Sequence, residues 1–179
     1  NSTTKTAIVI AGPCGSGKST LSLAVSSTLK VPFVEGDSLH TRSAVEKMES
    51  GTALVDEDRS SWLKRLCVRA QETLFDLGYD SVVMSCSALT TAYRGTMRQQ
   101  LQKQRVRVLF VDLQAGADAL AQRLETRAGH YMSATMVNGQ IDLHEDAAVE
   151  EVDVFPIDTE AGKAKVAEEA FWFLAKIVN

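Results

Sequence analysis

The 179-residue chain has few cysteines, no excess of positive charge and no long hydrophobic run, and each shortage argues against a class of protein. The three cysteines are an odd number without paired spacing, which fits a reducing compartment rather than a disulfide framework. The formal net charge of −4 argues against a nucleic-acid groove, which needs a clustered cationic surface. No apolar run reaches the about 18 residues that cross a bilayer, and the polar start predicts no signal peptide. We therefore expect a cytoplasmic protein that binds neither nucleic acid nor membrane.

The chain also lacks repeats, low-complexity tracts and Pro/Gly/Ser linkers, so we expect residues 1–179 to form a single domain. Short, continuously apolar runs alternate with segments of helical periodicity. The runs are typical of strands covered on both faces and comprise residues 7–11, 31–34, 82–84, 106–113 and 152–157. Their alternation with helices predicts an α/β fold in which a parallel sheet lies between helical layers. Ligands of such folds collect at the carboxyl ends of the strands.

Apolar residues at helical spacing predict four principal helices. The helices are expected to carry residues 21–29, 62–77, 89–101 and 166–177. Asp56 and Ser87 are the candidate N-caps of the second and third of them.

The strongest motif follows the first apolar run, where Gly12-Pro13-Cys14-Gly15-Ser16-Gly17-Lys18-Ser19 matches a phosphate-binding loop. In such a loop backbone amides point at phosphate oxygens, and the helix that follows adds its positive end. Lys18 supplies a mobile charge for the β- and γ-phosphates, and Ser19 offers a hydroxyl to Mg²⁺. The motif predicts ATP binding by Gly12, Cys14, Gly15, Ser16, Gly17, Lys18, Ser19 and Thr20. Cys14 is either a small neutral residue of a tight loop or an oxidation-sensitive thiolate.

Polar clusters also follow the second and third apolar runs. Asp37 could orient and deprotonate an attacking hydroxyl, or could be a turn residue that bonds its own backbone. The planar guanidinium of Arg59 suits a carboxylate or phosphate ligand. Arg94 and Arg98 are four residues apart, hence on one helix face, where two like charges cost stability unless an anion or carboxylate lies between them. This spacing favours a binding role.

In these motifs the sequence resembles the gluconokinases of the small P-loop kind. The matching segments are Gly36-Asp37-Ser38-Leu39-His40, Lys47-Met48, Asp58-Arg59, Trp62-Leu63, Ser87-Ala88-Leu89, Tyr93-Arg94, Arg98, Arg127-Ala128-Gly129-His130-Tyr131 and Gln140. The resemblance implies a P-loop nucleoside-kinase-like fold of three layers, with a five-stranded parallel sheet and a mobile lid at about residues 123–140. It also implies transfer of the γ-phosphoryl group of ATP to the 6-hydroxyl of D-gluconate, with Mg²⁺ as cofactor. Because the family is often dimeric, a homodimer is a further expectation.

The resemblance also implies a role for each matching residue. The expected catalytic residues are Lys18, Asp37 and Arg127; Arg123 and Arg127 of the lid are expected to reach the phosphates. The expected ligands of the substrate are Asp37, His40, Lys47, Arg59, Arg94, His130 and Gln140, and those of Mg²⁺ are Ser19 and Asp37. The family has no functional acid at Asp112, so we expect an ordinary strand-end residue there. We expect residues 158–160 to border the adenine and cap the final helix.

Two alternatives stay open. Another P-loop kinase, such as a shikimate kinase, shares the loop and an Asp after the second strand, although the motifs at Leu39-His40 and Asp58-Arg59 count against it. A catalytically silent nucleotide-binding protein is the other alternative. It is permitted by Ala44 and Gly95, which replace an Asn and an Asp that are usual in the family.

Overall fold

The computed structural model describes residues 4–125 and 134–178, in which five parallel strands form one sheet. The strand order is β2-β3-β1-β4-β5. The strands are β1 (Thr6–Ala11), β2 (Phe33–Glu35), β3 (Ser81–Ser85), β4 (Arg107–Gln114) and β5 (Val154–Asp158). Each overlaps an apolar run of the sequence, and neighbouring strands pair in parallel register. The predicted parallel sheet is confirmed.

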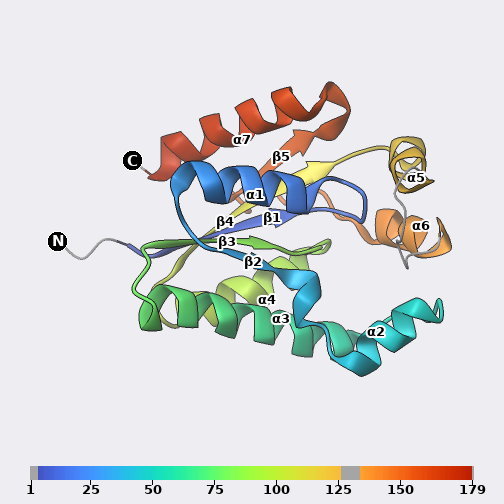
Figure 1. Ribbon diagram of the computed structural model, residues 1–179, viewed down its shortest axis with the longest axis horizontal. Coiled ribbons are helices and arrows are strands. Elements are labelled where there is room, and N and C mark those ends of the chain that lie inside the picture. Colours follow the sequence, from blue (N-terminus) through green and yellow to red (C-terminus); the bar gives the residue numbers. More distant parts are fainter. Residues whose placement is uncertain (1–3, 126–133, 179) are drawn as a thin grey trace.

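Helices cover both faces of the sheet (Figure 1). On one face lie α1 (Lys18–Leu29) and α7 (Lys163–Val178), which enclose one hydrophobic cluster with the sheet. On the other face lie α3 (Asp56–Gln71) and α4 (Thr91–Gln102), which enclose a second cluster. This burial on both faces explains why the strands read as continuous apolar runs. The predicted three-layer α/β fold is confirmed.

Shorter elements lie mainly near the carboxyl edge of the sheet, where the connections run. They are the 3₁₀ helix η1 (Gly36–Leu39), α2 (Arg42–Glu49), the π-helical end of α3 named η2 (Glu72–Asp76), α5 (Ala117–Glu125), α6 (Ala134–Leu143) and the 3₁₀ helix η3 (Thr159–Ala161). No helix in residues 4–125 or 134–178 combines the length and hydrophobicity needed to cross a bilayer.

Both predicted N-caps differ from those observed. Helix α3 begins at Asp56, so the capping position belongs to Val55, whose N–H donates to Asp58 Oδ2 at 3.3 Å. Helix α4 begins at Thr91 and is capped by Thr90, which accepts a hydrogen bond from the backbone of Tyr93. The carbonyl of Ser87 instead accepts the N–H of Gly12, which binds the end of β3 to the phosphate loop.

Candidate active site

Two clefts adjoin the phosphate loop, and residues of the loop line both of them. The first, which we call the α7 cleft, has a volume of about 820 Å³ and is lined by Gly15, Ser16, Gly17, Thr20, Arg123 and residues of η3 and α7. The second, the α3 cleft, has a volume of about 300 Å³ and is lined by Cys14, Lys18, Asp37, His40, Arg59 and Trp62 among others. The loop therefore forms a wall shared by two binding spaces.

The backbone of the phosphate loop depends on glycine where it leaves β1. Gly12 has φ 131°, and a Cβ there would lie 2.5 Å from the carbonyl oxygen of Leu113 on β4. Lys18 opens α1, and its Nζ donates to the carbonyl of Pro13 at 2.9 Å, so its ammonium lies over the loop. Ser16 Oγ is buried and has no hydrogen-bond partner within the described residues. Backbone amides at a helix start, a lysine and an unsatisfied hydroxyl together fit a phosphate chain.

The α7 cleft adds a wall of side chains beside the loop. Arg123 of α5 donates to the hydroxyl oxygen of Thr159 at 2.8 Å and to its carbonyl at 2.9 Å. Thr159 and Glu160 line this cleft. Asp158 caps η3 by accepting from Glu160 N, so the expectation that it caps the final helix is wrong.

The α3 cleft gathers most of the residues expected to bind the acceptor. Asp37 and His40 come from the turn after β2, and Arg59 and Trp62 come from α3. The imidazole of His40 stacks on Trp62, with ring centroids 4.5 Å apart and 12° between the planes. Burial lowers the pKa of His40, an effect that the nearby Asp37 partly opposes. His40 is therefore neutral at pH 7, when one ring nitrogen donates and the other accepts.

Gln140 connects α6 to the phosphate loop. Its side-chain oxygen accepts the backbone N–H of Cys14 at 2.8 Å, and Gln140 lines the α3 cleft beside Leu143. The Cys14 side chain is buried against Leu120 and neighbouring apolar residues. This packing favours the reading of Cys14 as a small neutral loop residue.

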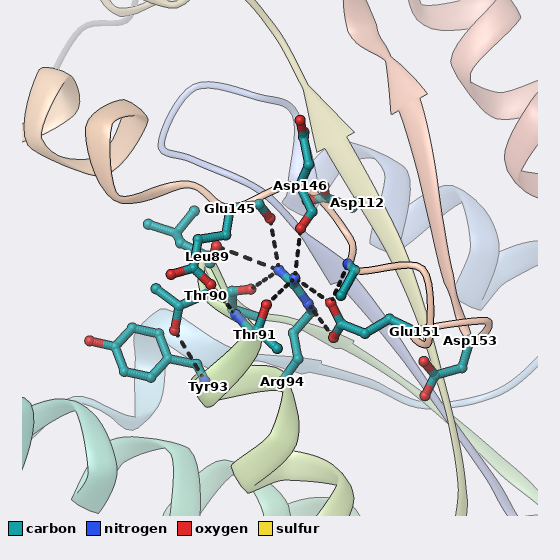
Figure 2. Close-up of polar contacts among 12 residues, drawn as sticks. Leu89, Thr90, Thr91, Tyr93, Arg94, Asp112, Glu145, Asp146, Glu151 and Asp153 are labelled. Carbon is teal, nitrogen blue, oxygen red and sulfur yellow. Dashed lines mark hydrogen bonds and ion pairs between the residues drawn. The ribbon is translucent and has the colours of Figure 1, made fainter.

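Arg94 is buried and bonded within the chain, which argues against its predicted role as a ligand of the substrate (Figure 2). Its side chain is 0% exposed, and its Nε and Nη2 donate to the two carboxylate oxygens of Glu151 at 2.9 and 2.7 Å. Its Nη1 donates to carbonyls that include those of Ala88 and Glu145, so the protein itself uses the guanidinium donors. Arg98 binds the same Glu151 and also Asp153. The carboxylate that the Arg94–Arg98 spacing called for is thus Glu151 of the chain itself.

The arginines also change the pKa of the carboxylate that they bind. Hydrogen bonds from Arg94, the largest influence, lower the pKa of Glu151 from 4.5 to about 2 despite burial. The segment after α6 is thereby fastened to α4 and to the loop after β3, because Arg94 binds the carbonyls of Glu145 and Asp146 as well as that of Ala88.

Three further predicted ligands are placed elsewhere or cannot be placed. Lys47 Nζ lies 2.6 Å from Asp58 Oδ2 and is not among the residues that line the α3 cleft. Arg127 and His130 lie outside the described residues.

The prediction that Asp112 is an ordinary strand-end residue is wrong. Its carboxylate is buried, and both oxygens lie 3.0 Å from His144 Nε2. This hydrogen bond raises the pKa of His144. The pair joins β4 to the residue that follows α6, so Asp112 has a structural role.

Comparison with known proteins gives a consistent result. The family described as an AAA domain matches residues 8–147. A probable gluconokinase of Schizosaccharomyces pombe is 37% identical over 98% of this chain and 91% of its own length. A gluconokinase of Arabidopsis thaliana is 34% identical over 80% of this chain and 79% of its own. The crystal structure of a gluconokinase from Sinorhizobium meliloti 1021 has a TM-score of 0.83 and 32% identity, covering 98% of this chain and 94% of that one.

Proposed function

The chain belongs to the gluconokinase family, and we propose that it transfers the γ-phosphoryl group of ATP to the 6-hydroxyl of D-gluconate. The products are 6-phospho-D-gluconate and ADP. The observation that supports this most directly is the phosphate loop as a wall shared by two clefts. A triphosphate that enters from the α7 cleft and follows the loop ends beside Lys18 and Asp37, which line the α3 cleft.

In the proposed mechanism each residue acts on position or charge. The loop amides and Lys18 hold the β- and γ-phosphates, and Asp37 orients the 6-hydroxyl and accepts its proton. The bond between the 6-oxygen of gluconate and the γ-phosphorus forms as the bond between that phosphorus and the β,γ-bridging oxygen breaks. ADP leaves with the electron pair of the broken bond. Ser19 and Asp37 are the residues that would hold Mg²⁺, which would neutralise phosphate charge when bound with ATP. On the basis of the family resemblance, we propose that Arg127 binds the transferring phosphoryl group and that Arg123 binds the nucleotide.

Arg59 is the best candidate for the gluconate carboxylate. It lines the α3 cleft, whereas Arg94 is fully buried and Lys47 is paired with Asp58. Its nearest acid is Asp56, at 3.5 Å, whose carboxylate is highly exposed. Solvent weakens such a pair, so a bound carboxylate can replace it at little cost. A planar guanidinium then binds a carboxylate through two parallel hydrogen bonds.

The wider expectations also remain proposals. We propose a single kinase domain over residues 1–179 with a lid at about 123–140, a cytoplasmic location and a homodimer. The contact of Gln140 with Cys14 supports the lid, because it brings α6 onto the phosphate loop.

The proposed function is tested by measuring ATP consumption with a panel of acceptors. D-gluconate, other sugar acids, shikimate and nucleoside monophosphates are each supplied with ATP and Mg²⁺, and 6-phosphogluconate dehydrogenase detects the expected product. We expect turnover with D-gluconate. Turnover with another acceptor alone would assign a different kinase activity, and ATP binding without any turnover would indicate a silent nucleotide-binding protein.

Replacing Asp37 by Asn is expected to lower kcat by about 100-fold or more, because a positioned general base contributes roughly that factor. Binding of ATP should be retained, since Asp37 lines the α3 cleft and not the α7 cleft. The measurement is kcat together with the dissociation constant of ATP. Asp76→Asn, the same substitution at an exposed aspartate of η2 that lines neither cleft, is the control. Unchanged turnover in Asp37→Asn would assign the base to another residue.

A further inference from the structure

The peptides on both sides of Gly36 are held by neighbouring elements. The N–H of Gly36 donates to Ser85 Oγ of β3 at 3.0 Å, and its carbonyl accepts the indole N–H of Trp62 at 2.7 Å. Both hydrogen bonds are buried, where their loss would leave polar groups unsatisfied. The Gly36 carbonyl belongs to the peptide that joins Gly36 to Asp37. The backbone that carries Asp37 is therefore fixed from α3.

Ser85 is itself oriented. Its hydroxyl donates to Glu35 Oε1, which leaves its oxygen free to accept from Gly36. The fit is close, because a Cβ on Gly36 would lie 2.1 Å from the carbonyl oxygen of Ser85. The turn is therefore packed closely between β3 and Trp62 of α3.

Trp62 also contacts the turn through its ring. The stacked pair with His40 means that one side chain of α3 fixes both ends of the segment from Gly36 to His40. Trp62 is itself only 4% exposed and belongs to the core cluster between α3 and the sheet. One turn further along the helix, Arg65 Nε donates to the carbonyl of Leu39 at 3.0 Å. The turn is thus held against α3 by Trp62 and Arg65.

We propose that Trp62 is the positioning residue of the acceptor site, setting Asp37 through its indole N–H and His40 through its ring face. The proposal rests on the kinase function proposed above, in which Asp37 and His40 meet the acceptor. Phosphoryl transfer depends chiefly on alignment, and a displacement of about 1 Å costs on the order of 100-fold in rate. A base on a short turn benefits from such support, because sites on loops are held less precisely than sites on long helices or strands.

The test is Trp62→Phe, which keeps a ring for His40 but removes the N–H that binds Gly36. We expect kcat for the acceptor to fall at least about tenfold, while KM for ATP stays within about twofold. The matched control is Trp172→Phe on α7, the same substitution at a tryptophan that is 55% exposed and lines neither cleft. It should leave both constants unchanged. If Trp62→Phe only destabilised the fold, less of the protein would be folded, but kcat per folded molecule would be unaltered.

Amide hydrogen exchange supplies a readout that does not depend on the acceptor. In Trp62→Phe the amides of residues 36–40 should exchange faster, while those of the phosphate loop should not change. Ser85→Ala, which removes the partner of the Gly36 N–H, should show the same two effects and serves if Trp62→Phe does not fold. Turnover within twofold of wild type in the folded variant overturns the proposal. If the wild-type protein does not phosphorylate gluconate, the proposed function fails, but this result alone does not test Trp62. In that case, unchanged amide exchange over residues 36–40 in Trp62→Phe would overturn the role of Trp62.

Discussion

Lys18→Ala is expected to lower kcat by about 100-fold to 1,000-fold, or roughly 3 to 4 kcal/mol of barrier. Lys18 begins α1, lines the α3 cleft and already lies over the phosphate loop through its bond to Pro13. Its ammonium is therefore preorganised near the place where charge develops on the transferring phosphoryl group. Loss of one such donor has an effect of this size because the site need not reorganise to use it.

The measurement is the steady-state rate with D-gluconate and saturating ATP. Lys64→Ala is the matched control, since Lys64 is an exposed lysine of α3 that lines neither cleft. We expect its kcat to equal that of the wild type. A near-normal turnover number in Lys18→Ala would contradict the assignment of the phosphate loop as the catalytic centre.

Arg94→Met is expected to lower the free energy of unfolding by about 3 to 5 kcal/mol. The methionine is close in length to arginine but leaves the buried Glu151 with fewer partners. It also leaves the carbonyls of Ala88 and Glu145 without their donor. Removing one partner of a buried, hydrogen-bonded ion pair is far more costly than the loss of a surface pair, even though Arg98 still contacts Glu151. Urea unfolding measures the difference.

The control for this variant is Arg42→Met, which breaks a pair with Glu46 between two highly exposed side chains. Its effect should be within about 0.5 kcal/mol.

The pH dependence offers a second check. Because folding lowers the pKa of Glu151 from 4.5 to about 2, wild-type stability from this group is present above pH 4.5 and is lost as the pH falls toward about 2. Arg94→Met should lose most of that slope. A small change in stability combined with a raised KM for gluconate would instead restore Arg94 as a ligand.

The sheet was predictable because its signal is local in the sequence. Continuous apolar runs such as residues 82–84 report burial on both faces, and the Gly-Lys-Ser of the phosphate loop reports a strand before it and a helix after it. The start of α4 was not predictable in the same way. Ser87 is a good capping residue by composition, but its carbonyl accepts the N–H of Gly12 from another part of the chain.

The sequence predicted several residues that line the site, but not which groups pair with its charged residues. Asp37, His40 and Arg59 line the α3 cleft as the motifs led us to expect. Arg94 has the same appearance in the sequence, yet its partner Glu151 lies 57 residues away. Pairings at that separation are set by tertiary packing, and a single sequence carries no local pattern for them. The hydrogen bond from Trp62 to Gly36 escaped prediction for the same reason.

Positions 36 and 37 should both tolerate substitution poorly, but the close packing at Gly36 makes the reasons different. Any side chain at position 36 collides with the backbone of β3, so nearly every missense variant there should be depleted from cells as misfolded protein. The exposed Asp37 beside it has no such restriction, and its variants should accumulate at normal abundance while failing to support growth on the substrate. In a saturation library scored for both abundance and growth, variants at both positions would score low for growth, but only those at position 36 would also score low for abundance.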